Sequence, residues 1–552
     1  MTWRTQEEGG SSMQPRPRRS RWRDLLTILL TLTMLAAACG DDDDEPTGQP
    51  GTQEPSGSTT SEAPGEPVSG GEATVLLFSE IGTLDPVRMT GSGGSDGMRG
   101  FALYGGLIVY DPEENRSVPV LAESFEPNDD FTVWTLELKP GITFSDGTAM
   151  DAEAVRVNWE RAKDVANRSP SLTTLLPVQS MTVTEPLTLT ITLAAPNAHF
   201  DNAIARVGAN YIASAKAIQD GTDLTSNAIG AGPFVLDNWL RDDRMLMSKN
   251  PNWKGSDGPY LDKLTFRVVG DEDQRIDTFI TGAADAFYTA TPSSVKRATE
   301  SVDGAEYTSV PVPMGQAFVF NTAKPPFDDL RMRKVFAQGV DWQAMADTVF
   351  GEGSVAPYNF TLEGSPWYNP DAKLPPYDPE EAQRLLDEYV ADTGGPVTIN
   401  YTAFQQSLDQ ARGEFIQTAL NQLDGIEVDV TVSDSPTNIQ NVLAGNFMVS
   451  SWGFPAVAPD PGIYNSVHSE SFNNYSKYNN AQVDAWLVES RRIASLEERL
   501  PLYANITKQL AEDIPFYPYV RTENGFVTAP DLHGAKVYDD GILRFDLLWK
   551  SN

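Results

Sequence analysis

Residues 118–162 read VPVLAESFEPNDDFTVWTLELKPGITFSDGTAMDAEAVRVNWERA. Apolar and polar side chains alternate over 132–138, which predicts a β-strand, and two glycine-containing turns follow within 139–147. Asp151 then stands where a helix should begin, so it is the predicted N-cap. The stretch therefore predicts a strand, two turns and a capped helix. One face of that helix would carry Val155, Trp159 and Ala162.

The same alternation of helical and β-rich runs continues through the rest of residues 72–552 and predicts an α/β fold. Asp378 is a predicted helix cap, because proline follows it and Glu381 completes a capping box. Pro501 stands six residues after another predicted cap, Ser495, and is expected to kink or delay that helix. Predicted strands include 73–78, 397–401 and 426–432.

A series of motifs resembles the family 5 extracellular solute-binding proteins, the peptide/nickel-type receptors of ABC importers. In that family P-x-L-A-x-S leads to W-T-x-x-L-x-x-G-x-x-F-x-D-G and then to an acid-capped helix, as in the stretch quoted above. The motifs occur in the family's order along most of the body, and their joint occurrence carries the resemblance. Further matches are AIGAGPF at 228–234, NPNW at 250–253, GAADA at 282–286, FVFN at 318–321 and PFDDLRMRK at 326–334.

The resemblance implies an α/β fold of the periplasmic-binding-protein type (type II, large peptide-binding subclass), in which hinge strands join two lobes and an extra subdomain is present. The Pro-rich segments Val310–Met314 and Ile514–Pro518 are the predicted hinge strands. The expected boundaries are about 72–112, 220–314 and 516–552 for lobe I, 113–219 for the extra subdomain, and 315–515 for lobe II.

The N-terminal segment has the pattern of a lipoprotein signal peptide. An arginine-rich head precedes an apolar run of 14 residues, 25–38, which is too short to span a bilayer. Small residues then lead to Cys39, the only cysteine in the chain. We therefore expect residues 1–38 to be a signal peptide and Cys39 to be lipidated. The alternative is simple cleavage that leaves Cys39 unmodified.

Residues 39–71 predict a disordered tether, because they are acidic, rich in Pro, Gly and Ser, and poor in aliphatic side chains. The first 38 residues hold 6 of the 41 basic and 3 of the 77 acidic side chains, so the remainder has a net charge of −39. Such a charge excludes nucleic acid as a partner and disfavours anionic membrane surfaces. We expect an exported protein, lipid-anchored to the outer face of the cytoplasmic membrane.

The resemblance also implies where a ligand would bind. The family's loop W-x-x-D-x-x-D-P carries an aspartate, three residues after the tryptophan, that takes the amino terminus of bound peptides. Here the tryptophan is Trp452, and the aspartate position is Pro455, which offers neither charge nor N–H. Asp460 could substitute for the missing aspartate, or could equally be a turn residue before Pro461.

The predicted ligand-binding residues fall in two groups, one after a glycine-rich turn and one in and beyond this loop. Each aromatic member could equally belong to the core. The first group is Met98, Phe101 and Tyr104; the second is Trp452, Phe454, Asp460, Tyr464 and Asn465.

Residues 93–97 satisfy G-x-S-x-G, a motif of serine hydrolases, with Ser95 as its serine. No strand precedes it, and Ser95 or Asp96 capping a helix from about Gly97 explains the same residues. His199 and His468 are expected at the surface, without a second metal ligand at a recognisable spacing. We predict no catalytic residue, no cofactor and no metal.

These features together predict a binding protein and no enzyme. The expected role is capture of a small solute, most simply a peptide or peptide-like molecule, in an interlobe cleft, followed by delivery to the permease subunits of an ABC importer. We expect a monomer that meets the membrane only through its lipid. The alternatives are an extracellular serine hydrolase and a non-transport surface receptor on the same scaffold.

Overall fold

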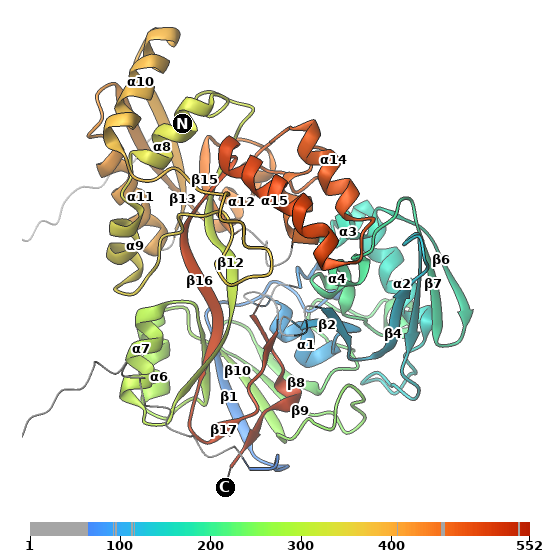
Figure 1. Cartoon of the computed structure of the whole chain (residues 1–552). Coiled ribbons are helices and arrows are strands. Elements are labelled where there is room, and N and C mark those ends of the chain that lie inside the picture. Colours follow the sequence, from blue (N-terminus) through green and yellow to red (C-terminus); the bar gives the residue numbers. More distant parts are fainter. Residues whose placement is uncertain are drawn as a thin grey trace, which may run out of the picture. The chain divides into compact units, whose positions relative to one another are not determined.

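The computed structural model (Figure 1) describes residues 65–551 except 92, 94–95, 112–113, 115, 406, 454–458 and 539–540. The predicted signal peptide, the lipidation site and most of the predicted tether therefore lie outside the described residues. Residues 64–552 form one compact unit. Within its described part, no helix combines the length and apolarity needed to cross a membrane.

A ten-stranded sheet organises the body, and only two of its strands, β12 and β16, belong to both halves. They are the longest strands and pair antiparallel from one half into the other (Figure 1). In sheet order the strands are β14 (Ile426–Ser433), β13 (Val397–Phe404), β15 (Val449–Gly453), β12 (Glu306–Phe320), β16 (Phe516–Thr528), β11 (Ala286–Thr289), β1 (Glu72–Leu77), β10 (Lys263–Val268), β9 (Arg244–Lys249) and β8 (Phe234–Leu240).

Two large hydrophobic cores divide along these shared strands and define the two lobes. Val310 and Phe526 belong to the core of lobe I, whereas Ala317 and Val520 belong to that of lobe II. Between the cores the β12–β16 pairing slips, because Val312 faces Thr522 but Gln316 faces Val520. The predicted hinge segment 310–314 overlaps this irregularity. The other predicted segment, 514–518, ends before it, within lobe II.

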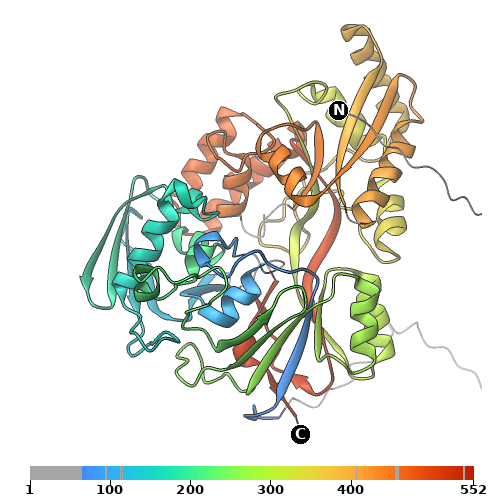
Figure 2. The same ribbon diagram turned by 180° about the vertical axis from the view of Figure 1, so that it is seen from behind.

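The region predicted as the extra subdomain, 113–219, holds a separate four-stranded sheet (Figure 2), which confirms the strand predicted at 132–138. Asp151 caps α2 as predicted, since its carboxylate accepts a hydrogen bond from Ala154 N at 2.9 Å. Trp134 and Trp159 pack edge-on against Phe200 with ring centroids 6.1 Å apart in each pair. The elements are β4 (Ala122–Pro127), β5 (Val133–Leu138), β7 (Thr188–Leu193), β6 (Val178–Glu185) and α2 (Ala152–Lys163).

The two helices predicted after Asp378 and Ser495 in lobe II are both present, and the structure corrects one detail of each. Asp378 caps α10 (Pro379–Thr393) as predicted and accepts from Glu381 N at 3.0 Å. The second half of the capping box is absent, because the Glu381 carboxylate pairs with Arg384 instead. Helix α15 (Leu496–Asp513) begins directly after its cap, Ser495, and includes Pro501, so the proline does not delay it.

The remaining helices and short strands cover the sheets and connect them. In chain order they are α1 (Gly97–Tyr104), β2 (Ile108–Asp111), β3 (Arg116–Pro119), α3 (Leu172–Leu175), α4 (Phe200–Ala205), α5 (Ala215–Gln219), α6 (Glu272–Ile280), α7 (Pro292–Ser301), α8 (Leu330–Gln338), α9 (Trp342–Phe350), α11 (Ser407–Leu420), α12 (Ser435–Leu443), α13 (Tyr464–Val467), α14 (Ala481–Ser490), β17 (Leu532–His533), β18 (Val537–Tyr538), β19 (Ile542–Leu543) and β20 (Trp549–Lys550).

Candidate functional site

The parallel strands of both lobes end at the crossing segment of β12 and β16. In lobe I, β1 and β11 run parallel, and the last residue of β11, Thr289, pairs with Gly525. In lobe II, β13 and β15 run parallel, and the last residue of β15, Gly453, pairs with Gln316. The two sets of carboxyl ends thus face each other across the slip in the pairing. In α/β proteins, ligands bind outside such carboxyl ends.

Aromatic side chains gather at and beside these strand ends, and all of them are partly exposed except Tyr288, which is 8% exposed. Phe78, directly after β1, is 38% exposed, and its ring centroid lies 5.4 Å from that of Tyr288. On the lobe II side the Trp452 ring lies 5.2 Å from Tyr475 and 6.4 Å from Phe404, the last residue of β13. We call these five residues the strand-end aromatics. Trp452 alone was predicted from sequence; the positions of the other four follow only from the folded structure.

The first predicted group lies on α1, within the core of lobe I. Met98, Phe101 and Tyr104 are at most 1% exposed. The Tyr104 hydroxyl donates to the carbonyl oxygen of Leu84 at 2.7 Å, and burial raises the pKa of this tyrosine. The Phe101 ring packs edge-on against Trp253. All three side chains have core neighbours, and ligand contact by any of them stays a prediction.

Asp460 is part of a buried ion pair. Its side chain is fully buried and accepts from Arg491 Nε at 2.6 Å and Nη2 at 3.1 Å. The guanidinium carbon of Arg491 lies 3.2 Å from the ring centroid of Tyr464. Because this carboxylate is already neutralised inside the protein, it is not free to take the ammonium group of a ligand.

The other loop residues are placed as follows. Tyr464 and Asn465 are half-buried at the start of α13, and the Asn465 carbonyl accepts from Ser471 Oγ at 2.5 Å. Phe454 and Pro455 lie outside the described residues. For these positions, too, ligand contact stays a prediction.

The prediction that His199 and His468 are surface residues is wrong, since each is 8% exposed. His199 Nε2 lies 3.0 Å from the carbonyl oxygen of Ile493, which is 294 positions away in the chain. The His468 ring stacks on Tyr464 at 4.7 Å between centroids. Loop-like sequence around His199 concealed its burial by a distant segment, whereas His468 packs against a residue only four positions away. Among the described residues no group of three or more His, Cys, Asp or Glu side chains could hold a metal ion.

Asp96 occupies the N-cap position of α1, but its side chain makes no cap hydrogen bond. Its carboxylate instead accepts from Thr90 N at 2.8 Å, Thr90 Oγ1 at 2.9 Å and Gly91 N at 2.9 Å, so it fixes the preceding loop. Burial raises the pKa of Asp96, although these hydrogen bonds oppose the shift. Ser95, the serine of the hydrolase alternative, lies outside the described residues.

Acidification is expected to destabilise the protein through His199. Burial, reinforced by the nearby positive charge of Arg499, lowers the pKa of His199 to about 4. Below the ordinary value of about 6.5 the unfolded chain binds a proton that the folded protein refuses, so the free energy of unfolding falls as pH drops from 6.5 to 4. The loss from this residue should reach about 3 kcal/mol at pH 4.

Chemical denaturation of wild type and of His199→Gln across pH 4 to 7 measures this contribution. Glutamine does not titrate in this range and keeps an N–H donor for the Ile493 carbonyl, so the variant should show a flatter profile. His533→Gln, at a half-buried position near the C-terminus, is the control and should keep the wild-type slope. Equal slopes for wild type and His199→Gln would contradict the assignment.

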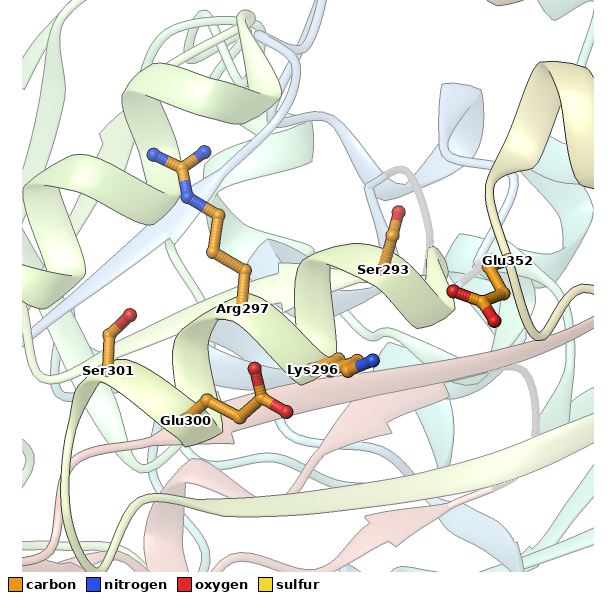
Figure 3. Close-up of a pocket in the computed structure, with 6 residues that line it drawn as sticks. All are labelled: Ser293, Lys296, Arg297, Glu300, Ser301 and Glu352. Carbon is orange, nitrogen blue, oxygen red and sulfur yellow. The ribbon is translucent and has the colours of Figure 1, made fainter.

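A hollow of about 280 Å³ is lined by α7 and the turn that follows α9 (Figure 3). Its charged side chains carry both signs, and Arg297 is already paired with Asp273 and Asp277. Nothing in this lining favours one ligand charge, so we place the candidate site at the strand ends. The lining residues are Ser293, Lys296, Arg297, Glu300, Ser301 and Glu352.

Two lobes joined through shared strands, with the carboxyl ends of their parallel strands facing each other, define the class of bilobal solute-binding proteins. The family model described as "Bacterial extracellular solute-binding proteins, family 5 Middle" matches residues 116–476. The chain belongs to this family. The resemblance seen in the sequence and the predicted fold class are therefore confirmed, and the family consists of transport binding proteins, not enzymes.

Named relatives and solved structures agree with this membership. The glutathione-binding protein GsiB of Escherichia coli O1:K1 is 27% identical over 460 residues, which are 81% of this chain and 88% of that protein. The structure of AgaA from A. tumefaciens R10, in complex with agropinic acid, aligns with a TM-score of 0.77 at 21% identity over 87% of this chain and 99% of that one. The structure of DppA from Helicobacter pylori, in complex with the peptide STSA, aligns with a TM-score of 0.75 at 21% identity over 88% of this chain and 99% of that one.

Proposed function

We propose that this protein is the lipid-anchored receptor of an ABC importer, which captures a small solute between its lobes outside the cytoplasmic membrane and delivers it to the permease. Family membership supports the solute-binding role. The observation that carries the placement of the site is the convergence of parallel strand ends on the single crossing of β12 and β16. A hinge at that crossing would open and close the site without disturbing either core.

The ligand we propose is a peptide or a peptide-like small molecule. The relative named above is a glutathione-binding protein, and DppA was solved with a tetrapeptide. The strand-end aromatics offer flat apolar faces suited to side chains of such a ligand. Because Pro455 replaces the ammonium-binding aspartate and Asp460 is paired with Arg491, we propose that a free amino terminus is not held by this loop.

Anchoring through Cys39 is the second part of the proposal. The signal pattern of residues 1–38 and the single cysteine support it. A diacylglyceryl cysteine carries at least two acyl chains, which are enough for stable attachment, whereas one chain binds only marginally. The acidic residues 39–71 would then form a leash that lets the body reach its permease.

Native mass spectrometry of the protein, purified without denaturation, tests the binding role directly. A discrete adduct, released on unfolding and identified as a peptide or peptide-like molecule, is the expected result. Titration calorimetry with glutathione, the peptide Ser-Thr-Ser-Ala and agropinic acid extends the search. An adduct of another chemical class would overturn the ligand assignment, and absence of both adduct and binding would overturn the receptor role.

Trp452→Ala is expected to weaken binding of the identified ligand by roughly 5- to 150-fold, because a stacked aromatic face contributes roughly 1–3 kcal/mol when its neighbours exclude water. Calorimetric titration of wild type and variant gives the ratio of dissociation constants. Tyr377→Ala is the matched control, since Tyr377 is an exposed aromatic residue ahead of α10, away from the strand ends. Equal affinities for the two variants would remove Trp452 from the site.

A further inference from the structure

We infer that residues 198–202, the segment that leads into α4 and its first turn, are a clasp that holds lobe II in the closed arrangement. Three hydrogen bonds run from residues 198–202 to lobe II. Ala198 N donates to the Arg491 carbonyl at 2.7 Å, His199 Nε2 lies 3.0 Å from the Ile493 carbonyl, and Asn202 Nδ2 donates to the Asp460 carbonyl at 2.9 Å. All three acceptors are backbone oxygens of lobe II.

The clasp is buried and therefore specific. His199 and Asn202 are each 8% exposed, and Asp460 is 2% exposed. A buried donor or acceptor that loses its partner costs more than the bond contributes, so separation requires water to enter at all three points. Nε2 must carry the proton when it faces a carbonyl oxygen, and the neutral imidazole can supply that proton.

The buried ion pair keeps the lobe II side of the clasp in register. The Asp460 carboxylate binds the Arg491 side chain, while the backbone oxygens of the same two residues accept from the subdomain. Tyr464 covers the Arg491 guanidinium from the other side. Arg491 is therefore a positioning residue: it holds two of the three acceptors in place, and we assign it no contact with the ligand.

The clasp and the hinge lie on different elements. The clasp is a connection separate from the β12–β16 crossing, and it joins lobe II to the extra subdomain of lobe I. In this region α4 lies beside the segment that leads into α15 (Figure 1). Rotation about the crossing must break these three bonds. Their free energy therefore contributes to the balance between closed and open forms before any solute arrives.

Spin-label distances in the solute-free protein test the clasp. Cys39→Ser leaves no natural thiol, so Val165→Cys in the subdomain and Lys508→Cys in lobe II, both at exposed positions, become the only labelled sites in the full chain. The wild-type background should give mainly the short, closed distance. Asn202→Ala and His199→Leu should each increase the open-to-closed ratio about 2- to 10-fold, as expected for one hydrogen bond.

Matched variants separate the clasp from general damage. His199→Gln keeps a donor and should retain the closed distance, and Asn238→Ala, at an exposed position on β8, should change nothing. Asp460→Asn combined with Arg491→Met removes the positioning pair without leaving a buried charge and should also favour the long distance. Unchanged distances in all clasp variants, or a wild type that is already open, would overturn the inference.

This inference rests on the proposed function only in supposing that closure serves solute capture. The distances are measured without solute, so a protein that binds none of the tested ligands could still show the clasp, and a ligand-binding protein could still lack it.

Discussion

Cys39→Ser is expected to move the protein from the membrane fraction to the soluble fraction. The chain contains no other cysteine, so no second thiol can receive the lipid. The body carries a strong negative charge and is repelled by anionic headgroups, so the body itself should not hold the protein to the membrane. Loss of two acyl chains, at about 0.8 kcal/mol for each buried CH₂, should reduce the membrane-bound fraction by well over tenfold.

Fractionation after metabolic labelling with a radioactive fatty acid measures both attachment and its cause. Ser56→Ala, a substitution of similar size in the predicted tether, should leave labelling and attachment unchanged. The Cys39→Ser protein should bind solute as the wild type does, because the substitution lies 33 residues ahead of the first sheet strand, β1. A variant that remains with the membrane would refute the lipid anchor.

Arg491→Met is expected to lower the free energy of unfolding by about 3–5 kcal/mol, the range for breaking a buried pair and leaving one charge without its partner. The Asp460 side chain is fully buried, so water cannot replace the guanidinium. Arg492→Met provides a neighbouring control. The Arg492 side chain is 56% exposed, its pairing distance to Glu489 is 3.9 Å, and its loss should cost at most about 0.5 kcal/mol.

Chemical denaturation of the single variants and of Asp460→Asn with Arg491→Met gives the test. Removing both charges leaves no buried ion, so the double variant should recover much of the stability that Arg491→Met loses. If the double variant is no more stable than Arg491→Met, the cost comes from lost packing around Tyr464 and the ion-pair explanation is wrong.

Local signals in the sequence were sufficient for the fold class and for several helix starts. Asp151 and Asp378 act within three residues of themselves, so a short pattern contains all the information needed. The capping box at Asp378 was only half correct, because Arg384, one turn further along the helix, competes for Glu381. Competition between near neighbours limits such predictions even where the helix itself is right.

The candidate site was harder to predict because its residues meet only in the folded sheet. Trp452 could be selected because it lies in a family motif. Phe78 and Phe404 could not, because only the ends and the register of their strands place them at the candidate site. The sequence suggested two roles for Asp460, a ligand-binding carboxylate or a turn residue. Its ion pair with Arg491, 31 residues away, is a third role that no local pattern indicates. The burial of His199 depends on a carbonyl 294 residues distant.

The central position of β16 has a consequence for how the chain is assembled. β16 lies between β12 and β11, yet its residues, 516–528, come after every other strand of the ten-stranded sheet. A polypeptide threaded through a membrane pore from its N-terminus would therefore present both half-sheets before the strand that joins them. The pairing of β11 and β12 with β16 can therefore form only after residues 516–528 have crossed the membrane.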